Sequence, residues 1–308
     1  MRVFVTGASG YIGGSVANAL VERGDEVVGL TRSAERAKAL EKLGIEPVVG
    51  ALGAWELLVE QARAADAVVA AADADDAYAA SALLTGLRGS GKRLVHTSGT
   101  SIVGDMAAGE PSDLVHTEDG HLNARSRFEK AGRVAIDRAV LDAAKDGVHA
   151  IVVVPPMIYG EGTGLHTESI QVPGLIRVSR ATGAGVHVGR GLNRWSNVHI
   201  ADLVDLYLLA LDRAPSCSFF FAENGEASLM EIAAAISRML GFGGRTQALT
   251  LAEALEHWPP AAVHYSLASN VRVSAAKARA MLGWRPRYTS IVEEIERGCY
   301  ARADRAAG

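Results

Sequence analysis

Short apolar runs alternate with amphipathic stretches through the first half of the chain. The run at residues 2–7 (RVFVTG) leads into residues 11–23, where apolar side chains recur at the spacing of one helix face. Further apolar runs, separated by stretches with helical spacing, occur at residues 25–33 (DEVVGLTRS), 45–50 (IEPVVG), 66–71 (DAVVAA), 93–99 (RLVHTSG) and 149–156 (HAIVVVPP). Parallel strands buried on both faces have continuous apolar sequences and need crossover helices. The alternation therefore predicts an α/β fold with a doubly wound parallel sheet.

The pattern changes after Pro155 and Pro156. Glycine and proline become frequent, aromatic residues appear, and the regular alternation fades. Residues 198–214 (VHIADLVDLYLLALDRA) and 229–241 (LMEIAAAISRMLG) still show one apolar helical face each, and the second of these stretches ends at a glycine. We therefore expect a second, smaller domain in the second half of the chain.

Three glycines stand between the first strand and the first helix, in the sequence VTGASGYIGG. Gly7 frees the backbone for a tight turn, Gly10 lets main-chain N–H groups approach a pyrophosphate, and Gly13 lets the helix pack on the strand. The following helix directs the positive end of its dipole at the phosphates. The spacing G-x-x-G-x-x-G is one residue longer than the usual fingerprint. The sequence thus predicts a dinucleotide site whose glycine-loop residues are Gly7, Ser9, Gly10, Tyr11, Ile12 and Gly13.

The end of the second strand indicates which dinucleotide is bound. NAD-binding proteins place an acidic residue there, which bonds the ribose 2′-hydroxyl. This chain has Thr31, Arg32 and Ser33 instead. A guanidinium with flanking hydroxyls suits a 2′-phosphate because it presents a planar fork of donors, so we expect NADP(H) rather than NAD(H). At the end of a later strand, Ala70, Ala71 and Ala72 have side chains small enough for the backbone to approach the cofactor closely.

Composition narrows the class of protein. The chain has 308 residues, of which 49% are hydrophobic, and a formal net charge of −4. A sizeable core can form, and without a basic face we expect no nucleic-acid partner. Cys217 and Cys299 are too few for a disulfide framework or a metal site. The chain enters a strand at once, and no apolar run reaches the ~18 residues of a membrane span. We therefore expect a soluble cytoplasmic protein that acts on a small-molecule substrate, away from membranes.

Five segments carry a resemblance to a known family: TGASGYIGG, RLVHTSGTSIVG, VVVPPMIYGEG, NVHIADLVDLYLLAL and VSAAKARAMLGWRPRYTSIVEEIERG. Together they resemble the extended short-chain dehydrogenase/reductases, in the epimerase/dehydratase-like branch, over almost the whole chain. The resemblance implies a Rossmann dinucleotide-binding domain over residues 1–160 and a mainly substrate-binding domain over residues 161–308. We expect the segment around residues 186–213 to return to the Rossmann domain.

The resemblance also implies site residues. In the family a serine or threonine after the fifth strand polarises the substrate, a role that falls on Ser98 or Thr100 here. Both hydroxyls could instead cap the strand end. A proline after the sixth strand lies against the nicotinamide in the family, and Pro155 occupies this position. Tyr159 is expected near the substrate, and Trp195 is a candidate for the apolar wall of the substrate pocket.

The family's catalytic tyrosine and lysine are missing. Its pattern is Tyr-x-x-x-Lys-x-x-x-Glu on one helix face, and counting back from the sixth strand places Glu129, Arg133 and Asp137 at these positions. A second register, with Ser126 and Lys130, makes the strand arrive too late. Glu129 could act as the acid if burial raised its pKa, whereas the neighbouring Arg133 would lower that pKa. These two residues could also form a plain surface ion pair, and the sequence leaves both interpretations open.

These residues define a leading hypothesis and its alternatives. We expect an NADP(H)-dependent oxidoreductase that reduces a small carbonyl substrate without the usual Tyr-Lys pair. A nucleotide-sugar epimerase or dehydratase is less favoured, although Arg190 and Arg194 could hold a diphosphate. The resemblance to atypical members of the superfamily also allows a non-catalytic sensor of the dinucleotide's redox state. Family members often form dimers through the helix that contains Glu129, so a homodimer is a further expectation.

Overall fold

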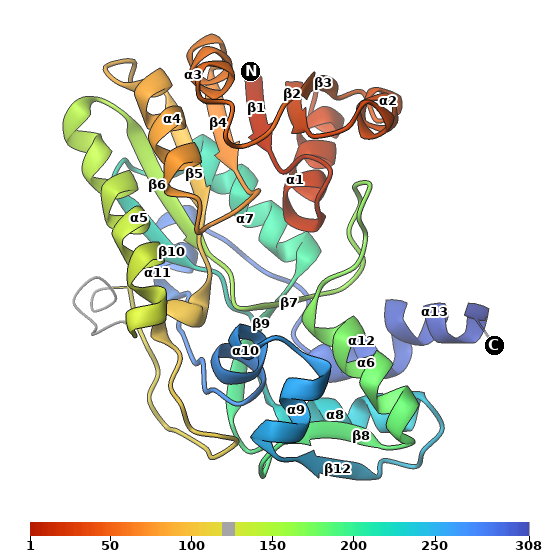
Figure 1. The fold of residues 1–308 in the computed structure, drawn as a ribbon. Helices are drawn as coiled ribbons and strands as arrows, with labels where there is room; N and C mark the ends of the chain where they lie inside the picture. Colours follow the sequence, from red (N-terminus) through yellow and green to blue (C-terminus); the bar gives the residue numbers. More distant parts are fainter. Residues whose placement is uncertain (119–126, 308) are drawn as a thin grey trace.

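The computed structural model describes residues 1–118 and 127–307, and a parallel sheet forms its centre (Figure 1). Seven strands lie in the order β10-β6-β5-β4-β1-β2-β3, and each neighbouring pair is parallel. The strands are β1 (Arg2–Thr6), β2 (Glu26–Thr31), β3 (Glu46–Val49), β4 (Ala67–Ala70), β5 (Arg93–Thr97), β6 (His149–Val154) and β10 (Ser218–Phe221). The chain runs outward from β1 in both directions, so the switch point of a doubly wound sheet lies between β1 and β4. The predicted fold class is confirmed.

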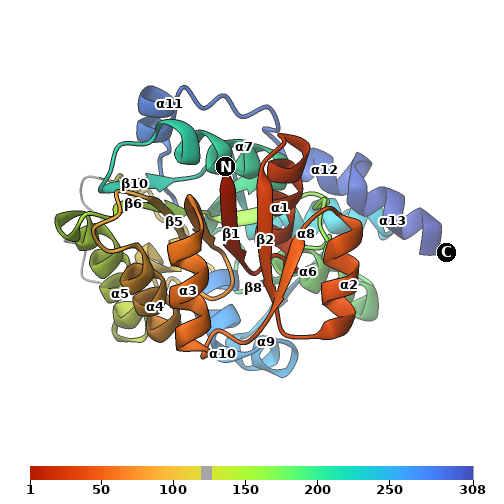
Figure 2. The same cartoon turned by 90° about the horizontal axis from the view of Figure 1, so that it is seen from above.

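Helices cover both faces of this sheet (Figure 2). Within β1, Phe4 packs into one core and its neighbours Val3 and Val5 pack into another, because successive side chains of a strand point to opposite faces. The Phe4 face lies under α3 (Trp55–Ala64), α4 (Ala77–Leu87) and α5 (Ala131–Asp142), and the opposite face lies under α1 (Tyr11–Glu22) and α7 (Ile200–Arg213). Helix α2 (Ala34–Lys42) packs beside β2 and β3.

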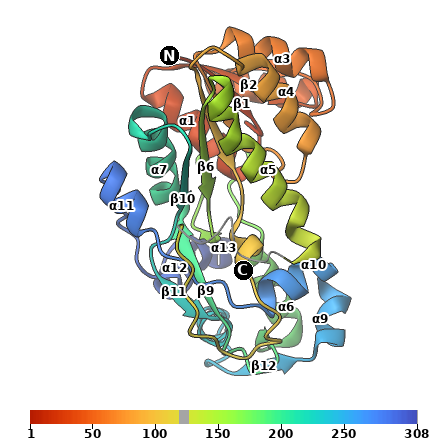
Figure 3. The same cartoon turned by 90° about the vertical axis from the view of Figure 1, so that its left-hand side faces the viewer.

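The other elements form a smaller cap, which Figure 3 shows beneath the sheet. It contains a three-stranded sheet in the order β11-β9-β7, made of Glu226–Ser228, Arg194–His199 and Met157–Tyr159. A parallel pair joins β8 (Gly185–Val188) to β12 (Thr246–Leu249). The cap helices are α6 (Gln171–Thr182), α8 (Leu229–Met239), α9 (Leu251–His257), α10 (Pro260–Ala262), the π-helical turn Val263–Leu267, α12 (Ile291–Arg297) and α13 (Cys299–Ala307).

The chain returns to the large domain after it has begun the cap. Helix α7 packs on α1, and β10 pairs with β6 at the edge of the sheet. Because β8 pairs with β12 inside the cap, the returning segment runs from α7 to β10 and does not begin at residue 186. Helix α11 (Ala276–Leu282) packs against the same part of the large domain, beside α7 and β10.

The C-terminal Leu-Gly-Trp segment is attached to the large domain through Asp202, whose side chain is fully buried. The Asp202 carboxylate accepts hydrogen bonds from the backbone N–H groups of Arg287 and Tyr288, both at 2.9 Å. Its backbone carbonyl accepts a third, at 2.8 Å, from Nε1 of Trp284. Asp202 therefore holds the segment from Trp284 to Tyr288 against the start of α7, in addition to placing a negative charge there. None of the helices in the described ranges combines the length and apolar composition needed to cross a membrane.

Candidate active site

The glycine turn leaves no room for side chains. Gly7 has a φ of +77°, and a Cβ on it would stand 2.6 Å from the carbonyl oxygen of Ala71. A Cβ on Gly13 would stand 2.4 Å from the carbonyl oxygen of Gly7, so α1 lies directly against the turn. Gly10 precedes α1 without a side-chain cap, which leaves the first N–H groups of this helix available for an anion. The backbone therefore has the form that a pyrophosphate site requires.

A cleft of about 550 Å³ opens beside this turn, at the switch point of the sheet. Seven of the predicted cofactor residues line it: Gly7, Ser9, Gly10, Thr31, Arg32, Ala71 and Ala72. Side chains or backbone from Leu30, Arg36, Gly50, Ala51, Leu52, Asp73 and His166 complete the wall. The size, the bare glycine backbone and the guanidinium groups at one end all fit a pyridine dinucleotide.

Two arginines, not one, face the end of this cleft. Arg32 follows β2, and Arg36 lies one helical turn further on in α2. Ser33 was expected beside the phosphate, but its hydroxyl caps α2 by accepting a hydrogen bond from the N–H of Arg36 at 3.2 Å. The hydroxyl of Thr31 is buried and finds no hydrogen-bond partner within the part of the chain that the structure describes. Arg36 lies in the first turn of α2, only four residues after Arg32, so it could have been proposed from the sequence.

The other predicted cofactor residues do not line the cleft. They pack against, or bond to, the segments around it. Tyr11 donates its hydroxyl to the carbonyl of Gly160 at 2.8 Å, while Ile12 packs against the core under α1. Gly13 is in contact with the turn, and Ala70 is buried in β4. The carbonyl of Pro155 accepts a hydrogen bond from the N–H of Thr100 at 3.2 Å. These placements leave cofactor contact at these positions a prediction.

The loop after β7 lies against the start of α1 and brings His166 to the cleft. A Cβ on Gly164 would stand 2.7 Å from the backbone of Gly14, and one on Gly162 would stand 2.9 Å from the ring of Tyr11. Gly164 is needed because the two backbones nearly touch, and Gly162 is needed because the ring of Tyr11 lies against it. This contact could not be predicted from the sequence, because the loop and α1 are about 150 residues apart and no local pattern links them.

A buried polar cluster supports the end of β5. The hydroxyl of Ser98 donates to the carboxylate of Asp137 at 2.7 Å, and Nε2 of His96 lies 3.7 Å from the other oxygen of that carboxylate. Burial raises the pKa of Asp137 to about 7, although the hydrogen bond from Ser98 and the charge of Arg133 oppose the rise. Burial, helped by Arg133, lowers the pKa of His96 to about 4. Since Ser98 commits its only proton to Asp137, it is poorly placed to polarise a substrate.

Two further hydroxyls stand near this cluster. Thr100 is 2% exposed, and its hydroxyl finds no partner among residues 1–118 and 127–307. Ser101, which the sequence analysis passed over, accepts a hydrogen bond from Nη1 of Arg133 at 3.3 Å and is only partly buried. A hydroxyl that accepts from a guanidinium keeps its own hydrogen for another acceptor. Ser101 is therefore a better candidate than Ser98 for contact with a substrate oxygen.

The expected ion pair between Glu129 and Arg133 is wrong. Arg133 pairs with Asp75, with Nε 2.8 Å from Oδ1 and Nη2 bonded to Oδ2. Glu129 lies in the 3-10 turn Phe128–Lys130, ahead of α5, and its carboxylate accepts a hydrogen bond from the hydroxyl of Tyr265. The two residues therefore do not share a helix face. Ser126, from the second register, lies outside the described residues.

Tyr159 and Trp195 are corrected as pocket residues. Tyr159 is fully buried and donates its hydroxyl to the carbonyl of Tyr288 at 3.1 Å, so it cannot reach a substrate. Trp195 is 3% exposed and donates its indole N–H to the carbonyl of Ser269 at 2.7 Å. Both residues hold the cap together. The sequence shows that an aromatic residue is present, but tertiary packing decides whether it faces a cavity or a core.

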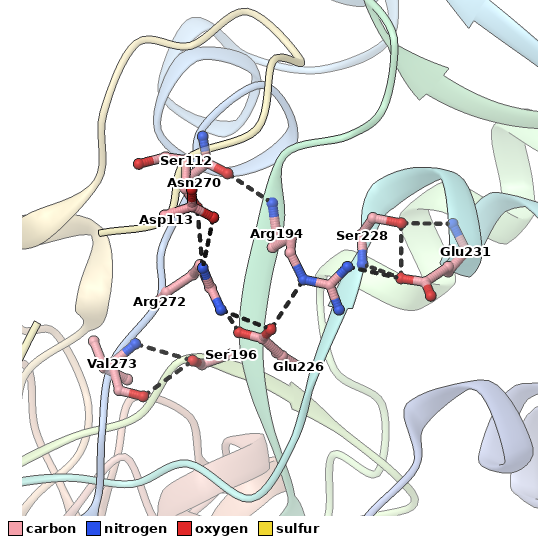
Figure 4. A network of polar contacts seen from close by, with 10 residues as sticks. All are labelled: Ser112, Asp113, Arg194, Ser196, Glu226, Ser228, Glu231, Asn270, Arg272 and Val273. Carbon is pink, nitrogen blue, oxygen red and sulfur yellow. Dashed lines mark hydrogen bonds and ion pairs between the residues drawn. The ribbon is translucent and has the colours of Figure 1, made fainter. Parts of the chain in front are cut away.

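Three arginines of the cap have carboxylate partners from the chain itself, and Figure 4 shows two of them, Arg194 and Arg272. Arg272 binds Glu226 through two hydrogen bonds of 2.8 and 3.0 Å, and Arg194 bonds to the same carboxylate at 3.0 Å. Arg190 bonds to Glu110 at 3.1 Å. The bonds of Arg194 and Arg272 to Glu226 join β9, β11 and the segment before α11. The three pairs leave little free positive charge for a diphosphate, which Arg190 and Arg194 could otherwise have held.

Known proteins share the fold and the residue pattern. A model of the NAD dependent epimerase/dehydratase family matches residues 3–217. The chain is 32% identical to the protein named oxidase ucsJ of Acremonium sp., over 96% of this chain and 95% of that protein. It is 31% identical to the 4-hydroxy-2-methyl-3-oxo-4-farnesyl-3,4-dihydroquinoline-1-oxide ketoreductase of Stigmatella aurantiaca, over 73% of this chain and 69% of that protein.

Among solved structures, a dTDP-glucose 4,6-dehydratase of Bacillus anthracis in complex with NAD superposes with a TM-score of 0.77. The alignment covers 99% of this chain and 97% of that one at 17% identity. At this identity the likeness shows the fold alone. No three metal-binding side chains gather into a site within residues 1–118 and 127–307.

Proposed function

Because the chain belongs to the NAD dependent epimerase/dehydratase family, we propose that it is an NADP(H)-dependent oxidoreductase that reduces a carbonyl group of a small organic substrate. The observation that carries the proposal is the cleft itself, where bare glycine backbone meets two guanidinium groups, those of Arg32 and Arg36. A 2′-phosphate is the part of NADP(H) that a pair of guanidiniums would recognise. Two relatives above 30% identity are named an oxidase and a ketoreductase, which supports redox chemistry over epimerisation.

The residues beside the cleft have distinct roles in this proposal. A bound reduced nicotinamide supplies the hydride. In this proposal Arg133, held by Asp75, bonds the ribose hydroxyls of the cofactor, and it also bonds to Ser101. Ser101 directs its hydroxyl hydrogen at the substrate oxygen and so polarises the carbonyl. Asp137 holds Ser98, and together they keep the end of β5 in place.

A nucleotide-sugar substrate fits this chain less well. Such a substrate carries a diphosphate, which needs free cationic side chains on the cap. The cap arginines Arg194 and Arg272 are instead bonded to Glu226, and Arg190 is bonded to Glu110. Opening these pairs would cost part of the binding energy. We therefore favour a substrate without a phosphate group.

Steady NADPH oxidation on a panel of ketones, aldehydes and quinones tests the proposal. We expect turnover with NADPH, weaker turnover with NADH, and a fall in kcat of about 10²-fold in Ser101→Ala, the usual scale for one lost polarising donor. Ser81→Ala, on the exposed surface of α4, is the matched control and should leave kcat unchanged. Binding of NADPH without turnover on any substrate would favour the redox-sensor alternative and contradict the proposal.

A further inference from the structure

Tyr265 of the cap meets the short turn that precedes α5. It lies on the π-helical turn Val263–Leu267, next to α10, which Figure 3 shows facing the start of α5. The Cζ of Arg127 lies 5.0 Å from the centre of its ring, and Nζ of Lys130 lies 5.3 Å from it. Its hydroxyl donates to the carboxylate of Glu129. One phenol of the cap is thus surrounded by three charged residues of the large domain.

Carbonyl reduction needs a proton for the oxygen, and most groups near the site cannot supply one. Tyr159 is fully buried and bonded to a backbone carbonyl, and Ser98 donates to Asp137. The hydrogen bond from Tyr265 lowers the pKa of Glu129, which keeps this carboxyl ionised at neutral pH. The guanidinium of Arg133 does not release a proton in proteins. Tyr265 differs because its phenol stays protonated, and its bond to an exposed carboxylate is easily exchanged for another acceptor.

Lys130 lies between Tyr265 and the pair of Arg133 and Asp75. Its ammonium lies over the Tyr265 ring and is close enough to Arg133 and Asp75 for their charges to act on it. Arg133 in turn bonds to Ser101, the hydroxyl assigned to the substrate oxygen. Tyr265 therefore belongs to one group of side chains with Lys130, Arg133 and Ser101. Tyr265 comes from the cap, whereas the other three come from the large domain.

We propose that Tyr265 is the proton donor for carbonyl reduction, delivered from the cap across the start of α5. The inference rests on the proposed function. The carbonyl carbon gains the hydride that the dinucleotide supplies, the C=O π electrons pass to oxygen, and this oxygen takes the proton of Tyr265. The carbonyl is reduced to an alcohol, and the dinucleotide is oxidised. Lys130 and Arg127 stabilise the phenolate until it regains a proton from water.

In this arrangement Glu129 is not the acid but the group that accepts the hydrogen bond of Tyr265 before a substrate binds. In the free protein its carboxylate holds the phenol and raises the pKa of Tyr265. A substrate carbonyl would displace Glu129 as the acceptor of the Tyr265 hydrogen. Removing the negative charge at Glu129 should then lower the pKa of Tyr265, and removing the positive charge at Lys130 should raise it.

Tyr265→Phe, with Tyr78→Phe as its control, tests the proposal. Tyr78 is 79% exposed on α4, so its hydroxyl is remote from the site. We expect kcat to fall by about 10²–10⁴-fold in Tyr265→Phe, the range for a lost general acid, with an unchanged NADPH dissociation constant. Tyr78→Phe should keep full activity. If the native protein reduces carbonyls and Tyr265→Phe keeps kcat within about twofold, the proton donor is another group.

A second measurement does not depend on turnover. Ultraviolet titration of the phenol in the free protein, with Tyr265→Phe as the blank, should show a lower pKa in Glu129→Gln and a higher one in Lys130→Met. The alkaline limb of the kcat profile should move with the titration in each variant, because the donor must be protonated. If the pKa of the phenol shifts in a variant while the alkaline limb of its kcat profile stays in place, Tyr265 is not the proton donor. A native protein that binds NADPH but reduces no carbonyl removes the proposed function, and the role of Tyr265 with it.

Discussion

The guanidinium of Arg133 is joined to the carboxylate of Asp75 by two hydrogen bonds, one of them from Nε to Oδ1 at 2.8 Å. The pair connects α5 with the loop that follows β4. Nη1 of Arg133 would stand 3.0 Å from a Cβ on Gly99, so the guanidinium lies close to the backbone just after β5. The pair therefore fixes the position of a cation beside Gly99 and Ser101, just after β5.

Asp75→Asn should have a small effect on stability, because the Asp75 side chain is 54% exposed. Exposed pairs contribute ~0.2–1 kcal/mol, so we expect the melting temperature to fall by less than about 4 °C at pH 7. Hydrogen bonds from Arg133 hold the pKa of Asp75 below its usual value. The stabilisation should therefore be lost only as the pH falls through that lowered value. The control is Asp113→Asn, whose side chain is fully exposed. A loss above about 2 kcal/mol relative to this control would show that the pair stabilises the fold more than its exposure implies.

Arg32→Ala and Arg36→Ala should each weaken NADPH binding much more than NADH binding. A hydrogen bond to a charged group contributes ~1.5–3 kcal/mol, which corresponds to roughly 10–100-fold in the dissociation constant of NADPH. Titration calorimetry with both dinucleotides measures the difference. The control is Arg63→Ala at the end of α3, which lies outside the wall of the cleft. Equal losses for both dinucleotides would remove the assignment of a 2′-phosphate site.

Gly13→Ala should disturb both the fold and the cofactor site. The new methyl group would stand 2.4 Å from the carbonyl oxygen of Gly7, and the nearest atoms are backbone, which cannot rotate away. Overpacking of this kind costs ~1–3 kcal/mol. Urea unfolding at pH 7 and NADPH titration should both show a loss. Gly53→Ala is the matched control, because a Cβ there meets nothing within 4 Å. Unchanged dinucleotide affinity in Gly13→Ala would contradict the position of α1 against the turn.

The buried pair of His96 and Asp137 should make stability depend weakly on pH in the native chain and strongly in variants. Folded Asp137 keeps its proton up to about pH 7, whereas an unfolded aspartate releases it near ~4, so rising pH destabilises the fold between these values. Folded His96 stays neutral down to about pH 4, whereas an unfolded histidine takes a proton near ~6.5, so rising pH stabilises the fold over that window. The two effects oppose each other.

Single substitutions should separate these effects. In Asp137→Asn we expect the free energy of unfolding to rise with pH between about 4.5 and 6.5, by on the order of 1.4 kcal/mol per pH unit. In His96→Asn we expect it to fall over the same range, with a similar slope. Urea unfolding at three pH values measures both slopes. Slopes of the same sign in the two variants would show that the residues do not titrate as assigned.

Asp202→Ala should be strongly destabilising. The substitution leaves the N–H groups of Arg287 and Tyr288 without their carboxylate, in a place where Asp202 itself is fully buried. Each unsatisfied buried donor costs ~1–3 kcal/mol, so we expect a loss of about 2–5 kcal/mol in urea unfolding. Asp205→Ala, one turn further along α7 and partly exposed, should cost less than about 1 kcal/mol. Similar losses in the two variants would mean that the C-terminal segment is held by packing alone.

The sequence by itself determined the sheet and the glycine turn. Both depend on local rules: a β-branched run forms a buried strand, a helical period forms a crossover helix, and glycine is needed where backbones nearly touch. The predicted strands at the N-terminal half agree with β1 to β6, and Gly7 and Gly13 are tightly packed as expected. Arg32 also follows from its place after β2, because strand ends at a switch point face the ligand.

Only the tertiary structure decided which polar groups meet. The pairing of Arg133 with Asp75, of Glu129 with Tyr265, and of Ser98 with Asp137 joins segments that are 39 to 136 residues apart or lie in different domains. A single sequence carries the identity of a side chain but not its distant partners, and a carboxylate takes whichever donor the fold brings nearest. For the same reason Tyr159 and Trp195 became parts of the core while Tyr265, which no sequence pattern singled out, reached the start of α5.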